Sequence, residues 1–397
     1  MPVGAWVHRE LSRPSPLLVL AVLTAMVTTA AKGQDPVVPD STRDSTEVAT
    51  KVKPDDGRFR FTPLLAPGYN PEMEFLIAGG FLLSFKTDPR DSLLPRSTLS
   101  ATVSWGSVGA INVASRFSSY WMQDRLRVRM DLSLKDMNDG YWGVGFDAGL
   151  EPTSNDSTTE YSRTWWAIKP AVLWAVRPNL YVGGLVDVNR TSATDVNPVM
   201  AADSAFVAGG PEILNTGLGV ALEYDSRDVP NNAWSGLFLS WNAMAYGRTL
   251  GGDFTYQTVV IDYRQYLPLG RPGRTLAWQV RSRLSFGDTP WPELALLGSG
   301  YDFRGYREGR FRAPQTLSAT VEYRSMFRKS GGNLSRHGFT VFAGLGVLGD
   351  KRFSLEGPLP QYGVGYRFEL QPRANVRVDF ARGKQSSGIY FNFQEAF

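Results

Sequence analysis

The chain has 397 residues, a formal net charge of +4 at pH 7 and a mean hydropathy of −0.21. The absence of cysteine excludes disulfides, thiol chemistry and cysteine-bound zinc, and the small, interspersed charge gives no support for nucleic-acid binding. A helical membrane protein needs apolar runs of roughly 20 residues, and none follows position 33. A membrane β-barrel is not excluded, because only every second residue of its strands faces lipid.

The first 33 residues have the pattern of a secretory signal peptide. Arg9 and Arg13 precede the apolar run Leu17–Leu23, and small residues follow at 28–31. We expect cleavage between positions 30 and 33, and the short apolar run disfavours the alternative of a retained membrane anchor. Residues 34–58 are rich in Pro, Asp, Ser and Thr and lack aromatic side chains. We therefore expect a disordered linker at 34–58, followed by one large domain at 59–397.

From about position 73 onward, apolar and polar residues alternate with the period of two that is typical of strands. We predict sixteen strands, most of them at least as long as the ~9–11 residues that a tilted membrane strand requires. They span 73–86, 96–105, 108–118, 124–135, 141–150, 160–174, 178–190, 215–226, 234–247, 253–267, 273–286, 314–327, 338–348, 360–370, 373–382 and 387–397. The sequence therefore predicts an all-β fold, a transmembrane antiparallel β-barrel of sixteen strands.

The lengths of the connections favour a membrane barrel over a soluble β-sandwich. If the first strand rises from the periplasm, alternate connections are outer loops, which are long in such barrels, while the inner turns are short. One inner connection, Arg328–His337, is longer than this rule predicts. The predicted outer loops include Glu151–Thr159, Thr191–Leu214, Gly287–Ala313 and Gly349–Leu359, and the short inner turns include Gly106–Ser107, Val176–Arg177 and Gln371–Pro372.

The last predicted strand has the pattern of a C-terminal assembly signal, which the outer-membrane assembly machinery reads. Its apolar residues share one face, and Glu395 occupies a position of that face where an apolar or aromatic residue is usual. The residues of this candidate signal are Ile389, Phe391, Phe393 and Phe397. We therefore expect outer-membrane lipid and the assembly machinery as partners, and a C-terminus in the periplasm.

The stretch Leu297–Arg312 resembles the sixth outer loop of the BamA/TamA-type superfamily, also called the bacterial surface antigen family. That loop carries a V/I-R-G-F/Y motif, and Phe303–Tyr306 (Phe-Arg-Gly-Tyr) matches it at three of four positions. Further matching segments are Tyr141–Gly145, Gly217–Asp228, Val321–Tyr323 and Tyr362–Phe397. The resemblance covers roughly Phe59–Phe397 and implies a long sixth loop that folds into the barrel lumen.

The resemblance implies that Arg304 ties this loop to the barrel wall. An arginine presents a planar, always-charged fork to a carboxylate, and Gly305 allows a tight turn beside it. The resemblance offers Glu322 as the partner, and the alternation of its strand independently places Glu322 in the lumen. The family's second carboxylate, from an F-x-D-x-G motif, is replaced here by Gly344. We expect a weaker lock or another lumenal acid, such as Glu369 or Asp379; the alternative is that Arg304 lies on a solvated loop.

In the superfamily the barrel commonly follows periplasmic POTRA domains of about 75 residues, and residues 34–58 leave too little chain for one. The resemblance therefore implies a stand-alone barrel that acts in outer-membrane protein assembly or surface architecture, with an unknown periplasmic partner in place of the missing arm. The runner-up is a passive pore or transporter of small solutes, with a lumen lined by arginines such as Arg127, Arg281 and Arg377 and by opposing acids.

An outer-membrane hydrolase is the third reading and the least supported. A Ser–His–acid site needs a histidine, and beyond the signal segment the only one is His337, in a predicted turn. Asp225 and Asp228 lie in a connection rich in Pro, Asn and Gly, where capping a turn is the expected role. No phosphate-binding loop or metal-ligand spacing occurs, so we predict no enzyme activity and no cofactor or metal.

Overall fold

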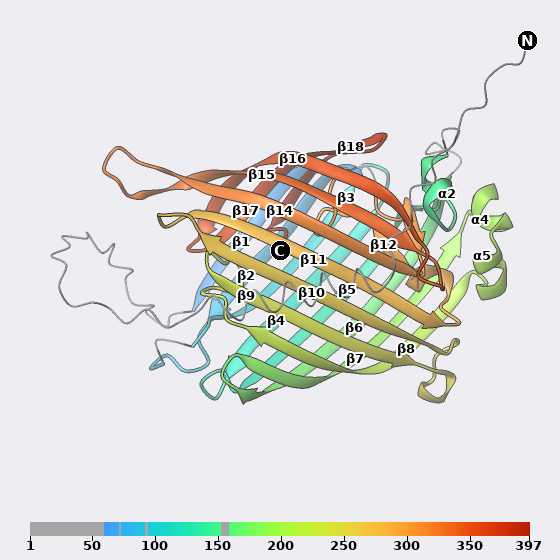
Figure 1. Cartoon of the computed structure of the whole chain (residues 1–397), viewed down its shortest axis with the longest axis horizontal. Helices are drawn as coiled ribbons and strands as arrows, with labels where there is room; N and C mark the ends of the chain where they lie inside the picture. The colour runs from blue at the N-terminus through green and yellow to red at the C-terminus, as the bar shows by residue number, and fades with distance from the viewer. Residues whose placement is uncertain (1–58, 71–72, 92–93, 152–158) are drawn as a thin grey trace, which may run out of the picture. The chain divides into compact units, whose positions relative to one another are not determined.

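A computed structural model describes residues 59–397 apart from 71–72, 92–93 and 152–158, so the predicted signal peptide and the whole of the predicted linker lie outside the described residues. Sixteen antiparallel strands follow one another around a barrel in sequence order (Figure 1). They are β1 (Arg60–Asn70), β2 (Glu74–Phe85), β3 (Ser97–Gly106), β4 (Ile111–Trp121), β5 (Leu126–Gly140), β6 (Glu160–Arg177), β7 (Leu180–Thr194), β8 (Glu212–Asp225), β9 (Gly236–Tyr246), β10 (Tyr256–Pro268), β11 (Arg274–Gly287), β14 (Gln315–Arg328), β15 (Leu334–Gly349), β16 (Leu355–Gln371), β17 (Ala374–Gly383) and β18 (Ser386–Phe393). The predicted fold class is confirmed.

The predicted number of strands is right because two errors cancel. The first strand, β1, was missed, because Pro63 and Pro67 interrupt its pattern. Proline is tolerated in an edge strand, and β1 pairs only with β2 in the described sheet. Conversely, the predicted strand 141–150 is not a strand: Gly143 and Gly145 adopt φ of 104° and 105°, and the short helix α2 (Phe146–Leu150) follows.

These two changes reassign one predicted turn. We call the end of the barrel that carries 141–151, 195–211 and 288–314 the loop end, and the opposite end the turn end; most of the predicted loop Glu151–Thr159 lies outside the described residues. Gly106–Ser107, predicted as an inner turn, lies at the loop end, where Met73 packs with Ala110 and Met137. The turns after β6 and β16 lie at the turn end, as predicted. The loop that follows β11 remains the sixth connection at the loop end.

The loop end carries the remaining elements, which pack into a cap. Trp291 is fully buried and makes edge contacts with Tyr141, Tyr161 and Phe206 at centroid distances of 5.7–6.1 Å. Asn197 caps α4 by accepting a hydrogen bond from the Met200 amide at 2.9 Å. The elements are α4 (Pro198–Ala202), α5 (Ser204–Gly209), η1 (Arg248–Leu250), η2 (Trp291–Glu293), β12 (Ala295–Leu297) and β13 (Phe311–Ala313).

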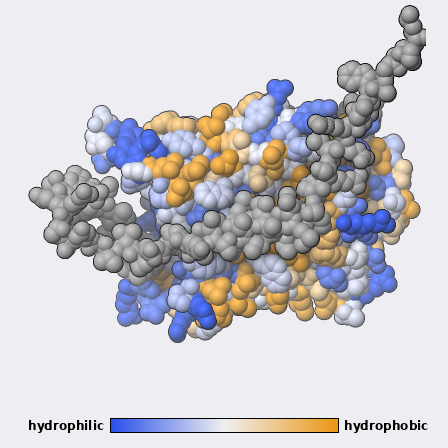
Figure 2. All heavy atoms as spheres, viewed as in Figure 1, coloured by the Kyte–Doolittle hydropathy of each residue, from blue (hydrophilic) through white to orange (hydrophobic). Residues whose placement is uncertain are grey.

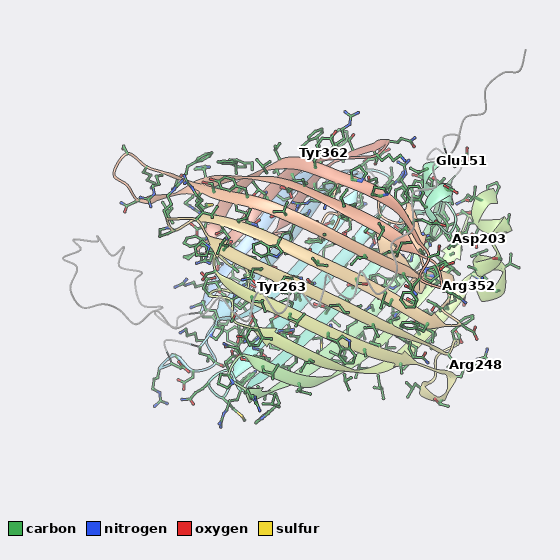
Figure 3. The ribbon with its side chains drawn as sticks, viewed as in Figure 1. Glu151, Asp203, Arg248, Tyr263, Arg352 and Tyr362 are labelled. Carbon is green, nitrogen blue, oxygen red and sulfur yellow. The ribbon has the colours of Figure 1, made fainter. Side chains whose placement is uncertain are left out.

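The strands have an apolar outer face and a polar inner face. On β14, Val321 is 43% exposed on the outside, while Glu322 is fully buried on the lumenal side. Orange, hydrophobic side chains accordingly cover much of the visible wall, and hydrophilic ones gather toward its two ends (Figure 2). Tyr263 and Tyr362 lie on the wall, and Arg248 and Arg352 at the loop end (Figure 3). No helix in the described ranges is both long and apolar enough to cross a membrane.

Candidate functional site

The sixth loop forms a hairpin that enters the lumen. At its base, β12 pairs with β13 from Ala295↔Ala313 to Leu297↔Phe311. The hairpin packs its apolar side chains against Leu348 and Leu359 of the wall, and together they form one buried cluster. Burial of these apolar side chains therefore stabilises the inward position of the loop, in the way that a small core stabilises a domain. The cluster comprises Leu297, Phe303, Tyr306, Phe311, Ala313, Leu348 and Leu359.

Arg304 lies at the tip of this hairpin and is fully buried. One terminal nitrogen contacts Glu322 of β14, and the other donates to Asp379 Oδ2 of β17 at 2.8 Å. The guanidinium carbon also lies 3.5 Å from the ring centroid of Phe342, on β15. One arginine thus contacts three separate strands of the wall through two charged hydrogen bonds and a cation–π contact.

The second carboxylate comes from β17 rather than from β15. A side chain at Gly344 would place its Cβ 2.5 Å from the backbone oxygen of Ala319 and 2.8 Å from Gln361 Nε2, so an aspartate does not fit there. Of the two expected substitutes, Asp379 contacts Arg304, whereas Glu369 accepts a hydrogen bond from the Arg373 amide at the turn end. The lock therefore has two carboxylates, and its expected weakening is not seen in the contacts.

Phe303, Gly305 and Tyr306 complete the motif. Phe303 and Tyr306 stack with ring centroids 5.7 Å apart, and the Tyr306 hydroxyl donates to the Pro360 carbonyl at 2.5 Å. Gly305 has a φ of 96°, and its amide donates to the Tyr390 hydroxyl of β18 at 3.0 Å. A Cβ at Gly305 would lie 2.8 Å from the Arg382 backbone, so glycine is required by conformation and by space.

Arg304 belongs to a larger ionic cluster, which we call the loop network. Asp379 also contacts Arg377 and accepts from Arg367 Nη1 at 2.5 Å, and Glu322 accepts from Arg324 Nε at 2.7 Å. Sequence reasoning missed the roles of Arg324 and Arg367, although strand alternation places both in the lumen. The loop network comprises Arg304, Glu322, Arg324, Arg367, Arg377, Asp379 and Glu395.

The last four residues differ from the predicted closing strand. β18 ends at Phe393, of which the structure describes the backbone but not the side chain. The next residue, Gln394, adopts a φ of 67°. Ile389 is 52% exposed on the outer wall, but Phe397 is only 6% exposed and packs with Tyr266 and Ala277. Phe397 therefore does not share the outer face of the strand. We call residues 394–397 the C-terminal tail.

Glu395 explains why the tail turns inward. Its carboxylate accepts from Arg367 Nε at 2.8 Å and from Asn375 Nδ2 at 2.7 Å, and the Phe397 carbonyl accepts from Arg324 Nη2 at 3.0 Å. Burial opposes ionisation of Glu395, but Arg367 and Arg324 hold the pKa of its carboxyl below the usual value. The loop tip and the C-terminal tail thus meet in one network, and the unusual acid of the last segment is one of its members.

The boundary between β1 and β18, which we call the seam, has no backbone ladder among the described residues. Near the turn end, Gln371 at the end of β16 donates to Thr62 of β1 and accepts from Ser84 of β2 at 3.4 Å, so a side-chain bridge spans the two sides of the seam without involving β18. Inside the seam lies a cavity of about 440 Å³, lined by Leu76 and Tyr390 among others, and a second cavity of about 320 Å³ lies against β1–β6. The lumen is therefore filled by the loop on one side and hollow beside the first strands.

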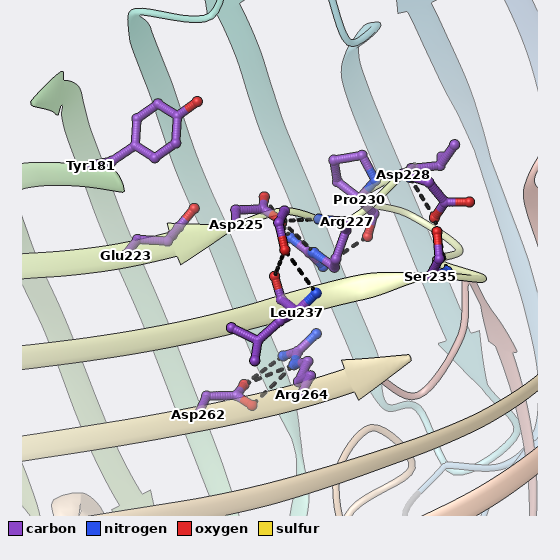
Figure 4. A network of polar contacts seen from close by, with 12 residues as sticks. Tyr181, Glu223, Asp225, Arg227, Asp228, Pro230, Ser235, Leu237, Asp262 and Arg264 are labelled. Atoms are coloured by element: carbon purple, nitrogen blue, oxygen red, sulfur yellow. Dashed lines mark hydrogen bonds and ion pairs between the residues drawn. The ribbon is translucent and has the colours of Figure 1, made fainter. Parts of the chain in front are cut away.

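The residues considered for catalysis have structural roles. His337 lies within β15 rather than in a turn, and its Nδ1 contacts the Tyr366 hydroxyl. Asp228 Oδ1 accepts from the amides of Val229 and Trp234 at 2.8 and 3.0 Å, the expected turn cap, and Asp225 pairs with Arg227 (Figure 4). In the described part of the chain, no group of His and acidic residues has the arrangement of a metal site.

The comparisons with known proteins concern the fold and the family of the chain. Among solved structures, BamA from Haemophilus ducreyi lacking POTRA domains 1–3 is similar at 13% identity and a TM-score of 0.56, over 85% of this chain and 69% of that one. CdiB from Acinetobacter baumannii matches at 10% identity and a TM-score of 0.48, over 85% and 65%. No curated protein matches in sequence. The model of the Omp85 superfamily domain matches residues 97–397, and the chain therefore belongs to the Omp85 superfamily of outer-membrane β-barrels.

Proposed function

We propose that this chain assembles other proteins into the outer membrane and that the seam between β1 and β18 receives the client strand. The observation that carries this proposal is the missing ladder at the seam: every other pair of neighbouring strands in the sixteen-stranded sheet is hydrogen-bonded. Unpaired strand edges are templates on which another strand can add by backbone hydrogen bonding. An incoming strand could add between β1 and β18, which no ladder joins in the described sheet.

The C-terminal tail supports the proposal, because it removes the end of the last strand from the seam. Arg367 and Asn375 hold Glu395 inside the lumen, and Phe397 packs on the opposite wall. β18 consequently spans only Ser386–Phe393, whereas β1 extends over Arg60–Asn70. β1 is therefore the longer of the two strands at the seam, and a client strand could pair along it.

The proposal includes an orientation and a partner. The turn end faces the periplasm and the C-terminus lies on that side, as the predicted signal peptide and the long connections at the loop end suggest. Barrels of this superfamily are generally non-enzymatic, and we extend this to the chain. A separate periplasmic protein would deliver clients to the turn end, and outer-membrane lipid and the assembly machinery would be needed for the insertion of the chain itself.

Closing the seam tests the proposal. Because the chain has no cysteine, cysteine pairs with one member in β1 and one in β18 can be introduced cleanly, with Val103→Cys/Val113→Cys in the paired strands β3 and β4 as the matched control. In proteoliposomes, oxidising the seam pair should stop the insertion of an unfolded outer-membrane protein, and reduction should restore it. Undiminished insertion with the seam crosslinked would refute the proposal.

A passive pore is the second candidate, and the two lumenal cavities of about 440 and 320 Å³ favour it. The sixth loop distinguishes the two candidate functions, because its residues Tyr301 and Tyr306 line the larger cavity and restrict a solute path through the lumen. We expect small, fluctuating conductance in planar bilayers. A large and steady conductance of the intact protein would favour the pore.

A further inference from the structure

One hairpin at the turn end extends past its neighbours. The ladder between β11 and β14 ends at Arg274↔Ser325, and the ladder between β15 and β16 ends at His337↔Phe368. The pairing of β14 with β15 continues to Arg328↔Leu334, so this hairpin stands beyond the rim without strands beside it (Figure 1).

The hairpin and the adjacent turn between β10 and β11 are basic and contain no acid. Residues 328–337 read RKSGGNLSRH, and residues 269–274 read LGRPGR. Within the described residues, none of their arginines and lysines forms an ion pair with an acidic side chain. We call these residues the basic patch; it comprises Arg271, Arg274, Arg328, Lys329 and Arg336.

The basic patch is held in place by uncharged partners. Arg336 donates to the carbonyls of Glu369 and Leu370 at 2.8 and 3.0 Å, and its guanidinium lies 4.8 Å from the ring centroid of Phe368. Arg271 donates to the Ser325 hydroxyl at 3.3 Å. Carbonyls and hydroxyls orient a guanidinium without neutralising it, so the charges remain available to an anionic partner.

Aromatic side chains lie directly below these charges on the outer wall. Phe339 stacks with Phe327 at 5.7 Å and contacts Tyr323 at 5.9 Å, and Phe327 is 46% exposed. In outer-membrane barrels, aromatic girdles mark the level where the hydrocarbon core meets the headgroups. The basic patch is therefore at the height of the lipid phosphates, and Figure 2 shows hydrophilic atoms gathered beyond an apolar wall at this end of the barrel.

The basic residues of the loop end provide a contrast. Lys351 and Arg352 are exposed, but they lie within Asp350–Glu356, which supplies an acid on each side, and Arg248 donates to the Asp253 carbonyl at 3.0 Å. Figure 3 shows Arg248 and Arg352 at that end. Basic residues thus occur at both ends of the barrel; those at 351–352 have an acid on each side along the chain, whereas the two segments of the basic patch contain none.

We infer that the basic patch binds the phosphates of anionic glycerophospholipids in the membrane leaflet at the turn end. Several Lys and Arg side chains close to a membrane surface attract anionic headgroups, and the apolar wall below receives the acyl chains. An acidic protein partner would need the charges only, whereas the aromatic girdle beside them fits a lipid. This inference needs the barrel to be in a membrane and does not depend on its activity in protein assembly.

The test measures lipid retention by the full-length protein. Native mass spectrometry of the detergent-solubilised protein with phosphatidylglycerol or phosphatidylethanolamine should show a preference for phosphatidylglycerol. The variant Arg328→Gln/Lys329→Gln/Arg336→Gln should reduce that preference by about a hundredfold, since each of the three basic residues near a lipid surface contributes about a factor of five. Heat-modifiable migration checks that the variant still forms the barrel.

The matched control is Arg248→Gln/Lys351→Gln/Arg352→Gln, which removes the same charge from the loop end and should keep the preference. Soluble glycerol phosphate should compete poorly, because it lacks acyl chains for the wall; strong competition would instead assign the patch to free phosphate and overturn the lipid site. Equal retention of the two lipids by the unaltered protein, or equal loss in both triple variants, would also overturn it. Unchanged phosphatidylglycerol retention in the hairpin variant would leave an acidic protein as the better partner.

Discussion

Two buried arginine clusters line the lumen, and they are built differently. In the wall network, Arg127 of β5 contacts Glu223 and Asp225 of β8 at 3.1 and 2.9 Å and lies 3.8 Å from the Tyr181 ring centroid. Its members, several of them visible in Figure 4, are Asp124, Arg127, Arg129, Glu223, Asp225 and Arg227, three cations and three anions. The wall network connects segments of the barrel wall to one another.

The loop network has four arginines and three acids, and it connects the wall to the loop tip and the C-terminal tail. Among the described residues, one nitrogen each of Arg304, Arg324 and Arg367 is buried without a protein partner, while the wall network has no such atom. A fully paired network rigidifies its surroundings, whereas each buried donor without a partner reduces the stability that a network contributes. The comparison teaches that two similarly buried arginine clusters can differ in what they connect: one joins strands of the wall, and the other joins the wall to the loop tip and the C-terminal tail.

The largest effect is expected for Asp379→Asn, which would sharpen the comparison. Asp379 is shared by Arg304, Arg367 and Arg377, so its loss leaves three buried guanidinium groups short of a counter-charge. We expect a loss of about 3–5 kcal/mol in the free energy of unfolding, measured by urea titration of the folded, heat-modifiable form. Asp131→Asn is the control, because its pair with Arg116 is half-exposed and contributes about 0–1 kcal/mol. Equal losses in both variants would contradict the central place of Asp379.

Arg304→Ala and Arg127→Ala test the comparison directly. Each variant removes one buried arginine, and we expect similar losses of about 1–3 kcal/mol, the range for hydrogen bonds to charged groups. Only Arg304→Ala should expose Leu297–Arg312 to added protease, because Arg127 holds no part of that loop. Cleavage of the loop in both variants would mean that the networks do not differ in function.

Two further variants define the lock itself. Arg304→Lys should rescue protease resistance only in part, since lysine has no planar fork for two carboxylates. Combining Arg304→Ala with Glu322→Gln should cost less than the sum of the single changes, because both remove the same contact. Fully additive losses would show that the two side chains do not interact in the membrane.

Glu395→Gln should release the C-terminal tail while leaving the loop in place. The lost ionic contacts with Arg367 and Arg324 are worth about 1–2 kcal/mol, and labelling of a Phe397→Cys probe should become fast. Because the folded-state pKa of Glu395 is depressed, its contribution is present above the unfolded pKa and lost as the pH falls through the folded one. Lowering the pH should therefore increase the labelling rate of the Phe397→Cys probe when Glu395 is present and have little effect on that rate in the Glu395→Gln variant. If acid increases the rate equally in both proteins, Glu395 does not anchor the tail.

The smallest effect is expected for Phe342→Leu, which removes the ring beneath Arg304. A cation–π contact contributes about 0.5–2 kcal/mol, so the loop should become slightly more sensitive to protease while the barrel stays folded. Phe380→Leu is the control, because Phe380 is 51% exposed on the outer wall. If the loop of the Phe342→Leu variant resists protease as well as the loop of the Phe380→Leu control, the two carboxylates hold Arg304 without help from the ring.

The sequence by itself determined the architecture and half of the lock. The period-two pattern predicts which side chains face the lumen, since successive strand residues point to opposite faces, and it placed Glu322 inside. The pattern fails where prolines interrupt the alternation of a true strand, and where an apolar run resembles a strand but does not form one. Pro63 and Pro67 obscured β1, and the apolar run at 141–150 turned at two glycines with positive φ.

Only the tertiary structure decided which lumenal charges meet. Arg304 is 75 positions from Asp379 and 18 from Glu322, and barrel closure brings both acids to the same guanidinium. The same holds for the tail: Phe397 fits the alternation of an outer face, yet Glu395 finds Arg367 inside and draws the last residues inward. Alternation is a property of one strand, whereas the pairing of charges depends on the curvature and register of all sixteen, because an arginine side chain reaches several strands across a lumen.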